Sequence, residues 1–284
     1  MTNNIEDILL QVLQTFHHVA GIDAIVLGGS HATGTANKNS DIDIGIYYDE
    51  TSFDLITFRH LAATLDDQHQ NDIITEPGEW GPWINGGGWL TINGIAVDLL
   101  FRNTKKVISV IDACIDGKIT IDYQCGHPFG FVNSIYMGEL AYCKILCNKN
   151  NLILDQKKRL DPFPRSYQKA VIERFLWECE FSMQCGSKAI SKGDVLYAAG
   201  SIFRCAISLL QVLYAINEMY MLNEKGCLQR LLQQKAAYLP INFAKDIKAA
   251  LSDLNANTIA DCFDRIKVQY HGLSKHHEHN FPVQ

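Results

Sequence analysis

A closely spaced aspartate pair is the first feature of this chain that could do chemistry. Asp41 and Asp43 are separated by one residue in the alternating stretch DIDIGIYY. Side chains alternate along a β-strand, so both carboxylates would leave the same face, about 7 Å apart at the backbone. Two carboxylates so placed can share a divalent cation, and Mg²⁺ prefers oxygen ligands completed by substrate phosphates and water. The pair therefore predicts a metal-assisted reaction on a phosphate-bearing substrate.

A glycine-rich turn precedes the pair in the sequence. Gly28 and Gly29 follow the apolar run DAIVL and let a ligand approach the backbone closely, while Ser30 adds a hydroxyl donor. We expect Ser30 to cap a short helix that begins near His31, whose unpaired N–H groups would face an anion. The turn thus predicts a phosphate site beside the metal site.

Asp98 supplies a third carboxylate. The runs WLTI and IAVDLLF flank Asn93-Gly94, the strongest short-range signal for a two-residue hairpin. This places Asp98 in the second hairpin strand among apolar residues, where an unpaired charge would be costly. A shared metal ion would give this carboxylate a partner.

Taken singly, these signals also have plainer interpretations. Asp-x-Asp pairs arise by chance, and Gly-Gly-Ser is common in strand-to-helix turns. Two other kinds of nucleotide-binding motif, the phosphate-binding loop of kinases and the dinucleotide-binding motif of oxidoreductases, do not fit the sequence. The Gly-x4-Gly at residues 29–34 is followed by Thr35-Ala36 instead of Lys-Ser/Thr, and Gly-x-Gly-x-x-Gly does not occur.

Hydrophobic periodicity indicates the elements that must position these residues. It predicts a helix over residues 5–20, strands at DAIVLGG and DIDIGIYY, a helix over TSFDLITFRHLAATLDD with a Ser or Thr cap, then the hairpin, a helix at TKKVISVIDACID and an edge strand at KITIDY. Strand signals stop there, and the later segments are predicted to be helical, among them NSIYMGELAYCKIL and residues 246–268. The fold class is therefore an α+β (α/β) domain over residues 1–130, with a mixed sheet and helices, followed by an all-α helical bundle over residues 131–284.

Composition limits the class of partner and compartment. A chain of 284 residues suits two domains, and its net charge of −6, without a run of Lys and Arg, makes a nucleic-acid partner unexpected. We recognise no signal peptide in MTNNIEDILLQVLQTFHHVAG and no apolar stretch of membrane-spanning length. Nine scattered cysteines without a Cys-x-x-Cys pair fit reduced thiols better than a disulfide framework or a zinc site. We expect a cytoplasmic protein with no membrane partner.

The combined pattern resembles the nucleotidyltransferase superfamily that includes DNA polymerase beta and the aminoglycoside and lincosamide nucleotidyltransferases. That pattern is Gly-Ser, some ten residues, Asp-x-Asp and a later strand aspartate, and Gly29-Ser30, Asp41-Ile42-Asp43 and Asp98 fill it. Gly34 and Ser40 also fall where members often have glycine and serine. The resemblance implies the nucleotidyltransferase-type sheet and, as in the antibiotic-modifying members, a trailing helical domain.

A departure from the family pattern lies within the short helix after Gly-Ser. Many relatives carry arginine there, whereas this chain has His31 and Thr33.

The resemblance also implies a reaction and a role for each residue. A hydroxyl oxygen would attack the α-phosphate of ATP or another nucleoside triphosphate, with pyrophosphate leaving and two Mg²⁺ ions assisting. Asp41 and Asp43 would bridge both ions, while Asp98 would hold the ion nearest the acceptor and draw off its proton. The residues expected to bind the nucleotide are Gly28, Gly29, Ser30, Ser40 and Lys225.

Several alternatives remain open at this level. For Lys225, a solvated lysine at a helix end before Gly226 is the more common arrangement and the alternative to a triphosphate contact. A glutamate could replace Asp98 as the base, the candidates being Glu79, Glu178, Glu180 and Glu224. The tryptophans of the segment EPGEWGPWINGGGW either stack on a substrate or pack in the core.

The acceptor is also open. We expect transfer of AMP to a hydroxyl of a small, antibiotic-like or metabolic molecule. The alternatives are a protein side chain as acceptor (AMPylation) and a catalytically idle nucleotide-sensing module of the same fold. The sequence does not specify the oligomeric state.

Overall fold

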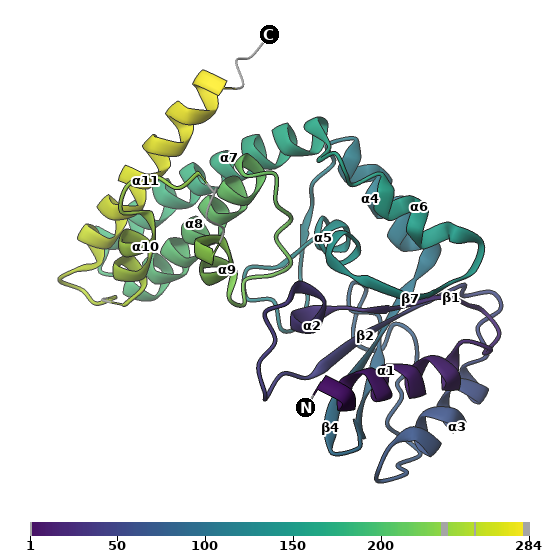
Figure 1. The fold of residues 1–284 in the computed structure, drawn as a ribbon. Helices are drawn as coiled ribbons and strands as arrows, with labels where there is room; N and C mark the ends of the chain where they lie inside the picture. Colours follow the sequence, from purple (N-terminus) through teal and green to yellow (C-terminus); the bar gives the residue numbers. More distant parts are fainter. Residues whose placement is uncertain (1, 234–237, 253, 281–284) are drawn as a thin grey trace. The chain divides into compact units, whose positions relative to one another are not determined.

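The computed structural model describes residues 2–233, 238–252 and 254–280 (Figure 1). By internal contacts the chain forms two compact units. The first unit comprises Met1–Asp112, Tyr123–Gly126 and Tyr136–Pro162, and the second comprises Ala113–Asp122, His127–Ile135 and Phe163–Gln284. The units interleave in sequence, so the first extends beyond residue 130, where we expected the boundary, because a later segment adds a strand to its sheet.

A five-stranded mixed sheet forms the centre of the first unit. Its strand order is β3-β4-β2-β1-β7; β2 and β4 are parallel, and every other neighbouring pair is antiparallel. The predicted mixed sheet is therefore confirmed. The strands are β1 (Ile22–Leu27), β2 (Ile42–Tyr48), β3 (Gly87–Ile92), β4 (Ile95–Asn103) and β7 (Lys144–Asn148).

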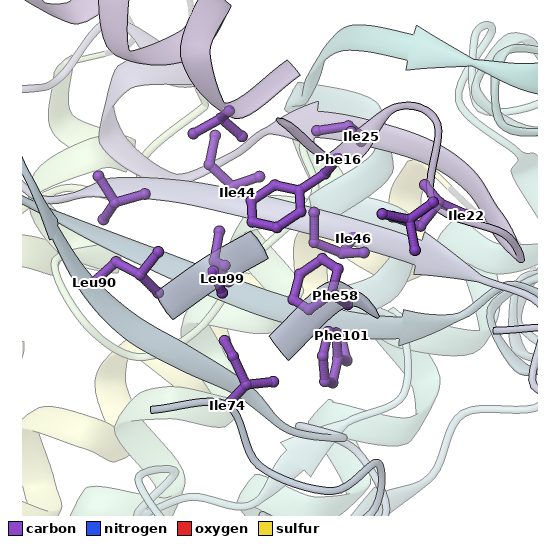
Figure 2. Packing of buried hydrophobic residues seen from close by; sticks show 14 of the residues in the cluster. Phe16, Ile22, Ile25, Ile44, Ile46, Phe58, Ile74, Leu90, Leu99 and Phe101 are labelled. Carbon is purple, nitrogen blue, oxygen red and sulfur yellow. The ribbon is translucent and has the colours of Figure 1, made fainter. Parts of the chain in front are cut away.

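One face of this sheet is covered by α1 (Thr2–Phe16) and α3 (Leu55–Leu65), which enclose the core shown in Figure 2. The rings of Phe16 and Phe58 stack with centroids 4.4 Å apart, and Phe101 of β4 meets Phe58 edge-on at 5.4 Å. The isoleucines of DIDIGIYY are fully buried on this face. Alternation therefore directs the Asp43 side chain to the opposite face of the sheet, as predicted.

The hairpin forms as the sequence predicts. Asn93 and Gly94 have φ values of 53° and 75°, and a type I′ turn requires positive φ at both positions. The turn joins β3 to β4, and α4 (Thr104–Ile115) follows directly. Asp98 consequently lies in the middle of β4.

The segment NSIYMGELAYCKIL differs from its prediction as one helix. It forms α5 (Ile135–Tyr142) and then β7, which pairs antiparallel with β1. The Lys157 ammonium ends the helix by donating to the carbonyl oxygens of Leu140, Ala141 and Cys143 at 2.6–3.2 Å. A short apolar run such as CKIL suits either helix or strand, and the edge of β1 decides in favour of a strand.

KITIDY forms a strand outside the main sheet. Its residues contribute β5 (Ile121–Asp122), which joins β6 (Phe131–Val132) in a separate two-stranded sheet instead of the edge of the main sheet. This small sheet belongs to the second unit, which is otherwise helical. The predicted edge strand is therefore confirmed, because both strands of a two-stranded sheet are edge strands.

Helices make up the rest of the second unit, and this confirms the predicted helical bundle. They are α7 (Arg165–Ile190), α8 (Val195–Ile216), α9 (Cys227–Gln233), α10 (Phe243–Ser252) and α11 (Ile259–Asn280); α6 (Leu152–Lys158) belongs to the first unit. The predicted helical segment 246–268 is thus two helices, and its Asp253 lies outside the described residues. By length and composition α8 could cross a membrane, but 72% of its most apolar window is buried, as in the central helix of a bundle.

Candidate active site

The candidate site is a row of four residues, Gly28, Asp43, Asp98 and Trp89, across the sheet face opposite α1 and α3. In the parallel pairing of β2 with β4, Asp43 lies directly opposite Asp98, and in the antiparallel pairing of β3 with β4, Trp89 lies opposite Asp98. On the other side of Asp43, the N–H of Gly28 donates to the Asp43 carbonyl at 2.8 Å. Neighbouring strands are about 4.8 Å apart, so the row brings together four segments that are distant in sequence.

The three predicted carboxylates are not equivalent in the structure. Asp43 and Asp98 are half-buried and opposed in register, whereas Asp41 is exposed and precedes β2. Within residues 2–233, 238–252 and 254–280, no three His, Cys, Asp or Glu side chains form a group that could hold a metal ion. The structure therefore brings Asp43 and Asp98 together, and carboxylate oxygens are the donors that Mg²⁺ prefers.

Gly29 shows why a glycine turn is needed here. It opens α2 (Gly29–Thr33) with a φ of 56°, and a Cβ atom built on it would lie 1.7 Å from Oδ2 of Asp43. Any side chain would therefore collide with the carboxylate. Gly28 is the residue that caps α2, and Ser30 lies within the helix, so our expectation that Ser30 caps it was wrong.

His31 and Thr33, in the helix where many relatives carry arginine, make contacts at the loop from α2 to β2. The Thr33 hydroxyl donates to the Gly29 carbonyl at 3.1 Å, and Nε2 of His31 lies 3.4 Å from the carbonyl oxygen of Ser40. The Ser40 hydroxyl accepts the N–H of Asn37 at 2.9 Å. These contacts shape the turn that leads into the aspartate pair. Nucleotide contacts from Gly28, Gly29, Ser30 and Ser40 stay predictions.

Two of the three tryptophans in this segment, the half-buried Trp80 and the exposed Trp89, form a stacked pair at the end of the row. The rings of Trp80 and Trp89 stack with centroids 4.5 Å apart and an interplanar angle of 24°, and Trp89 is 64% exposed. Trp83 instead packs against the Tyr136 ring at 5.7 Å, with the Lys106 ammonium 4.7 Å from its centroid. Of the two alternatives for these tryptophans, packing therefore applies to Trp83. Trp80 and Trp89 form a surface on which a substrate could stack.

Gln124 is a structural residue of this site that sequence reasoning missed. Its buried side chain donates to the Trp80 carbonyl at 2.7 Å and accepts the N–H groups of Trp83 and Ile84 at 3.4 and 3.3 Å. The Tyr136 hydroxyl donates to the Trp83 carbonyl at 2.7 Å. The tryptophan loop is thus held by its backbone, and no short-range pattern in the sequence could have paired Gln124 with it.

A buried ion pair lies farther along the same face. Arg102 follows Asp98 at an even spacing on β4 and is 4% exposed; its Nε and Nη2 donate to the two carboxylate oxygens of Glu139 on α5 at 2.7 and 2.6 Å. Burial lowers the pKa of the Arg102 guanidinium, but the Glu139 carboxylate outweighs this and raises it. An arginine in an apolar strand indicates that an acidic partner is required, but only the fold shows that this partner is Glu139.

Removing one member of this pair should cost stability. Replacing Arg102 with Met is expected to lower the free energy of unfolding by about 3 kcal/mol, because Glu139 then keeps a partly buried charge without its partner. Urea unfolding of purified protein measures this loss. Arg102→Met combined with Glu139→Leu should recover part of it, and a single variant as stable as the unchanged protein would contradict the assignment.

Each glutamate considered as an alternative base has a contact of its own. Glu79 accepts the N–H of Glu76 at 2.9 Å in the first unit. In the second unit, Glu178 is buried beside Arg174 and Arg204, and Glu180 accepts the Tyr270 hydroxyl at 3.1 Å. These contacts give the glutamates a role in packing. Their assignment as bases remains untested.

Glu224 and Lys225 lie in the second unit. Glu224 accepts the N–H of Phe129 at 2.9 Å, and Nδ1 of His127 lies 3.3 Å from its carboxylate in an ion-pair contact. Lys225 is exposed and its N–H donates to the side chain of Asn223. A contact between Lys225 and a triphosphate therefore stays a prediction.

The Glu224 contacts should make the stability of the second unit depend on pH. Burial alone raises the pKa of this carboxyl group, but the contacts with His127 and the Phe129 N–H outweigh it and lower the pKa from 4.5. A lowered folded-state pKa stabilises the fold above the unfolded value, and this stabilisation is lost as the pH falls. Glu224→Gln should therefore be less stable than the unchanged protein at neutral pH, with the difference shrinking below pH 4.5. Thermal unfolding across this range measures it, and a constant difference would contradict the expectation.

Comparison with known proteins places the arrangement in a class. Residues 6–118, which carry β1 to β4 and the opposed aspartates, match the family model described as a nucleotidyltransferase domain. The match thus identifies residues 6–118 as a nucleotidyltransferase domain, the class that transfers nucleotidyl groups. More particularly, this segment carries the Gly-Ser and Asp-x-Asp pattern that resembles the polymerase-beta-like nucleotidyltransferase superfamily.

Solved structures are also similar to this chain. The crystal structure of a nucleotidyltransferase-like protein from Exiguobacterium sibiricum 255-15 is similar to this chain at 10% sequence identity, with a TM-score of 0.46. The match covers 96% of this chain and 75% of the other. No curated protein matches the sequence.

Proposed function

We propose that this protein transfers a nucleoside monophosphate, AMP from ATP, to a hydroxyl group of a small molecule and releases pyrophosphate. The single observation that carries the proposal is the opposition of Asp43 to Asp98 on β2 and β4, beside a glycine that leaves room for the Asp43 carboxylate. This gives two oxygen-donor side chains next to a turn that a phosphate can approach.

Each residue of the row would contact a different part of the substrates. The α-phosphate would lie beside Asp43 and the Gly28-Gly29 turn, and the acceptor hydroxyl would lie beside Asp98. A carboxylate oxygen of Asp98 would take the hydroxyl proton as the acceptor oxygen bonds to the α-phosphorus and the bond to the β-phosphate oxygen breaks. The side chains that would hold Mg²⁺ are those of Asp43 and Asp98, with Asp41 as a third carboxylate from the residue before β2. The chemistry that the ion would supply there is stabilisation of the negative charge on the transferred group and on pyrophosphate.

The acidic balance of the chain supports a small acceptor over a nucleic acid. A net charge of −6 does not provide the phosphate neutralisation on which nucleic-acid binding depends. All nine cysteines are free thiols, and this favours a reducing compartment, the cytoplasm, where ATP is also available. The proposal thus extends to a cytoplasmic, Mg²⁺-dependent enzyme, with a protein acceptor as the second candidate.

Labelled ATP with Mg²⁺ tests the activity. Incubation with panels of hydroxyl-bearing small molecules should release pyrophosphate and yield a labelled adduct, and chelation by EDTA should stop both. The double change Asp41→Ala, Asp43→Ala should abolish transfer, while Asp72→Ala, an exposed aspartate of the first unit, should retain it. Transfer that survives the double change would refute the site assignment. Nucleotide binding without product under every condition would favour an idle sensor.

A further inference from the structure

Trp89, stacked on the half-buried Trp80, exposes an aromatic ring to solvent beside Asp98. Trp89 is 64% exposed although it lies in the middle of β3, between the buried residues Gly88 and Leu90. Cross-strand partners point to the same face, so its ring shares the face of Asp98. An exposed tryptophan on a sheet, backed by a second ring, is a surface on which another flat group can stack.

The order of the row decides which substrate would meet this surface. From one side to the other it is Gly28, Asp43, Asp98 and Trp89. At about 4.8 Å between strands, Trp89 lies about 5 Å from Asp98 and about 14 Å from Gly28 at the backbone. The tryptophan pair is therefore next to the carboxylate that would receive the acceptor hydroxyl, and it is far from the turn that would receive phosphate.

The surface is also held in place before any ligand binds. The Gln124 side chain donates a hydrogen bond to the Trp80 carbonyl and accepts one from the Trp83 N–H, and the Tyr136 hydroxyl donates to the Trp83 carbonyl. Trp89 is fixed by its strand pairing. A rigid aromatic surface loses little conformational entropy when a ligand stacks on it, so it can contribute to affinity efficiently.

We propose that the Trp80–Trp89 pair is the acceptor-binding surface, and that the acceptor carries its reactive hydroxyl on or next to a ring with a flat apolar face. This inference rests on the proposed nucleotidyl transfer. An aromatic ring would stack on Trp89 through its π face, and a sugar ring would stack through its C–H face. With the ring over Trp89, a hydroxyl on its edge reaches toward Asp98.

Ligand binding without turnover tests the surface separately from the reaction. Benzyl alcohol and methyl β-glucoside serve as aromatic and sugar probes, with glycerol as a probe that has hydroxyls but no ring, and saturation-transfer NMR measures their binding. Trp89→Ala should weaken binding of at least one ring probe about tenfold, whereas Trp89→Phe should retain most of it. Trp177→Ala is the matched control, because Trp177 is 53% exposed and stacked on Phe181 in the second unit.

The outcomes distinguish this inference from the proposed function. Equal binding of glycerol and the ring probes, or ring binding unchanged in Trp89→Ala, would overturn the acceptor surface even if transfer is observed. Weaker binding of a non-hydrolysable ATP analogue to Trp89→Ala, with ring probes unaffected, would overturn it in favour of a nucleobase surface. Selective loss of ring binding would support it, and once an acceptor is known, the same change should raise KM for the acceptor about tenfold with little change in kcat.

Discussion

Replacing Asp98 with Asn is expected to leave ATP binding nearly unchanged while lowering transfer about 1000-fold. Asp98 is the carboxylate on the Trp89 side of the row. In the proposed function it would therefore meet the acceptor rather than the triphosphate. Loss of a general base costs about 100- to 10,000-fold, and an amide cannot take the proton. Single-turnover pyrophosphate release measures transfer, and titration with a non-hydrolysable ATP analogue and Mg²⁺ measures binding.

Asp43→Asn provides the contrast for this experiment. Asp43 lies between Gly28 and Asp98, and we expect its loss to impair nucleotide binding and transfer together. If Asp98→Asn weakened nucleotide binding as strongly as Asp43→Asn, the assignment of Asp98 to the acceptor side would be wrong.

The same substitution should have a second, independent effect on stability. Like charges directly opposite each other on neighbouring strands destabilise a sheet, so without metal Asp98→Asn should be about 0.5 kcal/mol more stable than the unchanged protein. Mg²⁺ should raise the Tm of the unchanged protein and raise that of the variant less, since ligand binding to the folded state stabilises it. A metal-independent Tm in both proteins would contradict a shared cation at this pair.

Replacing Gly29 with Ala should lower transfer at least about 100-fold, because the added methyl group would displace the Asp43 carboxylate. The built Cβ lies 1.7 Å from Oδ2 of Asp43, and a misplacement of about 1 Å in a reacting group can cost about 100-fold. The φ of 56° adds backbone strain of about 1 kcal/mol. Steady-state transfer and urea unfolding measure the two effects separately.

Gly34 provides the matched control in the same helix. It ends α2 with a φ of 73°, and a Cβ atom there meets nothing within 4 Å. Gly34→Ala should therefore show a similar loss of stability but retain most of the transfer activity. Equal losses of activity in the two variants would mean that strain in the turn, and not contact with Asp43, explains the effect.

Local patterns were sufficient for the elements that carry the candidate site. Strict alternation in DIDIGIYY predicts a strand with buried isoleucines and an aspartate face, and Asn93-Gly94 predicts the hairpin that carries Asp98; the structure confirms both. These features depend on side-chain periodicity and turn chemistry, which act over a few residues. The match to the nucleotidyltransferase domain family supports the same pattern.

Long-range pairing was decided only by the tertiary structure. The run CKIL suits either helix or strand until the edge of β1 pairs with it. At α2, where Gly29 lies against Asp43, Gly28 and not the predicted Ser30 is the cap. Pairings such as Arg102 with Glu139 and Gln124 with the tryptophan loop join residues that no local pattern relates.

Local sequence was enough to predict the candidate residues, which are three aspartates and a glycine turn, and the strands that carry them. The tertiary structure decided their neighbours, because strand register alone sets Asp43 opposite Asp98 and Trp89 beyond it. Register is fixed by burial of one whole face of each strand, and a shift of one residue would have turned every one of these side chains into the core.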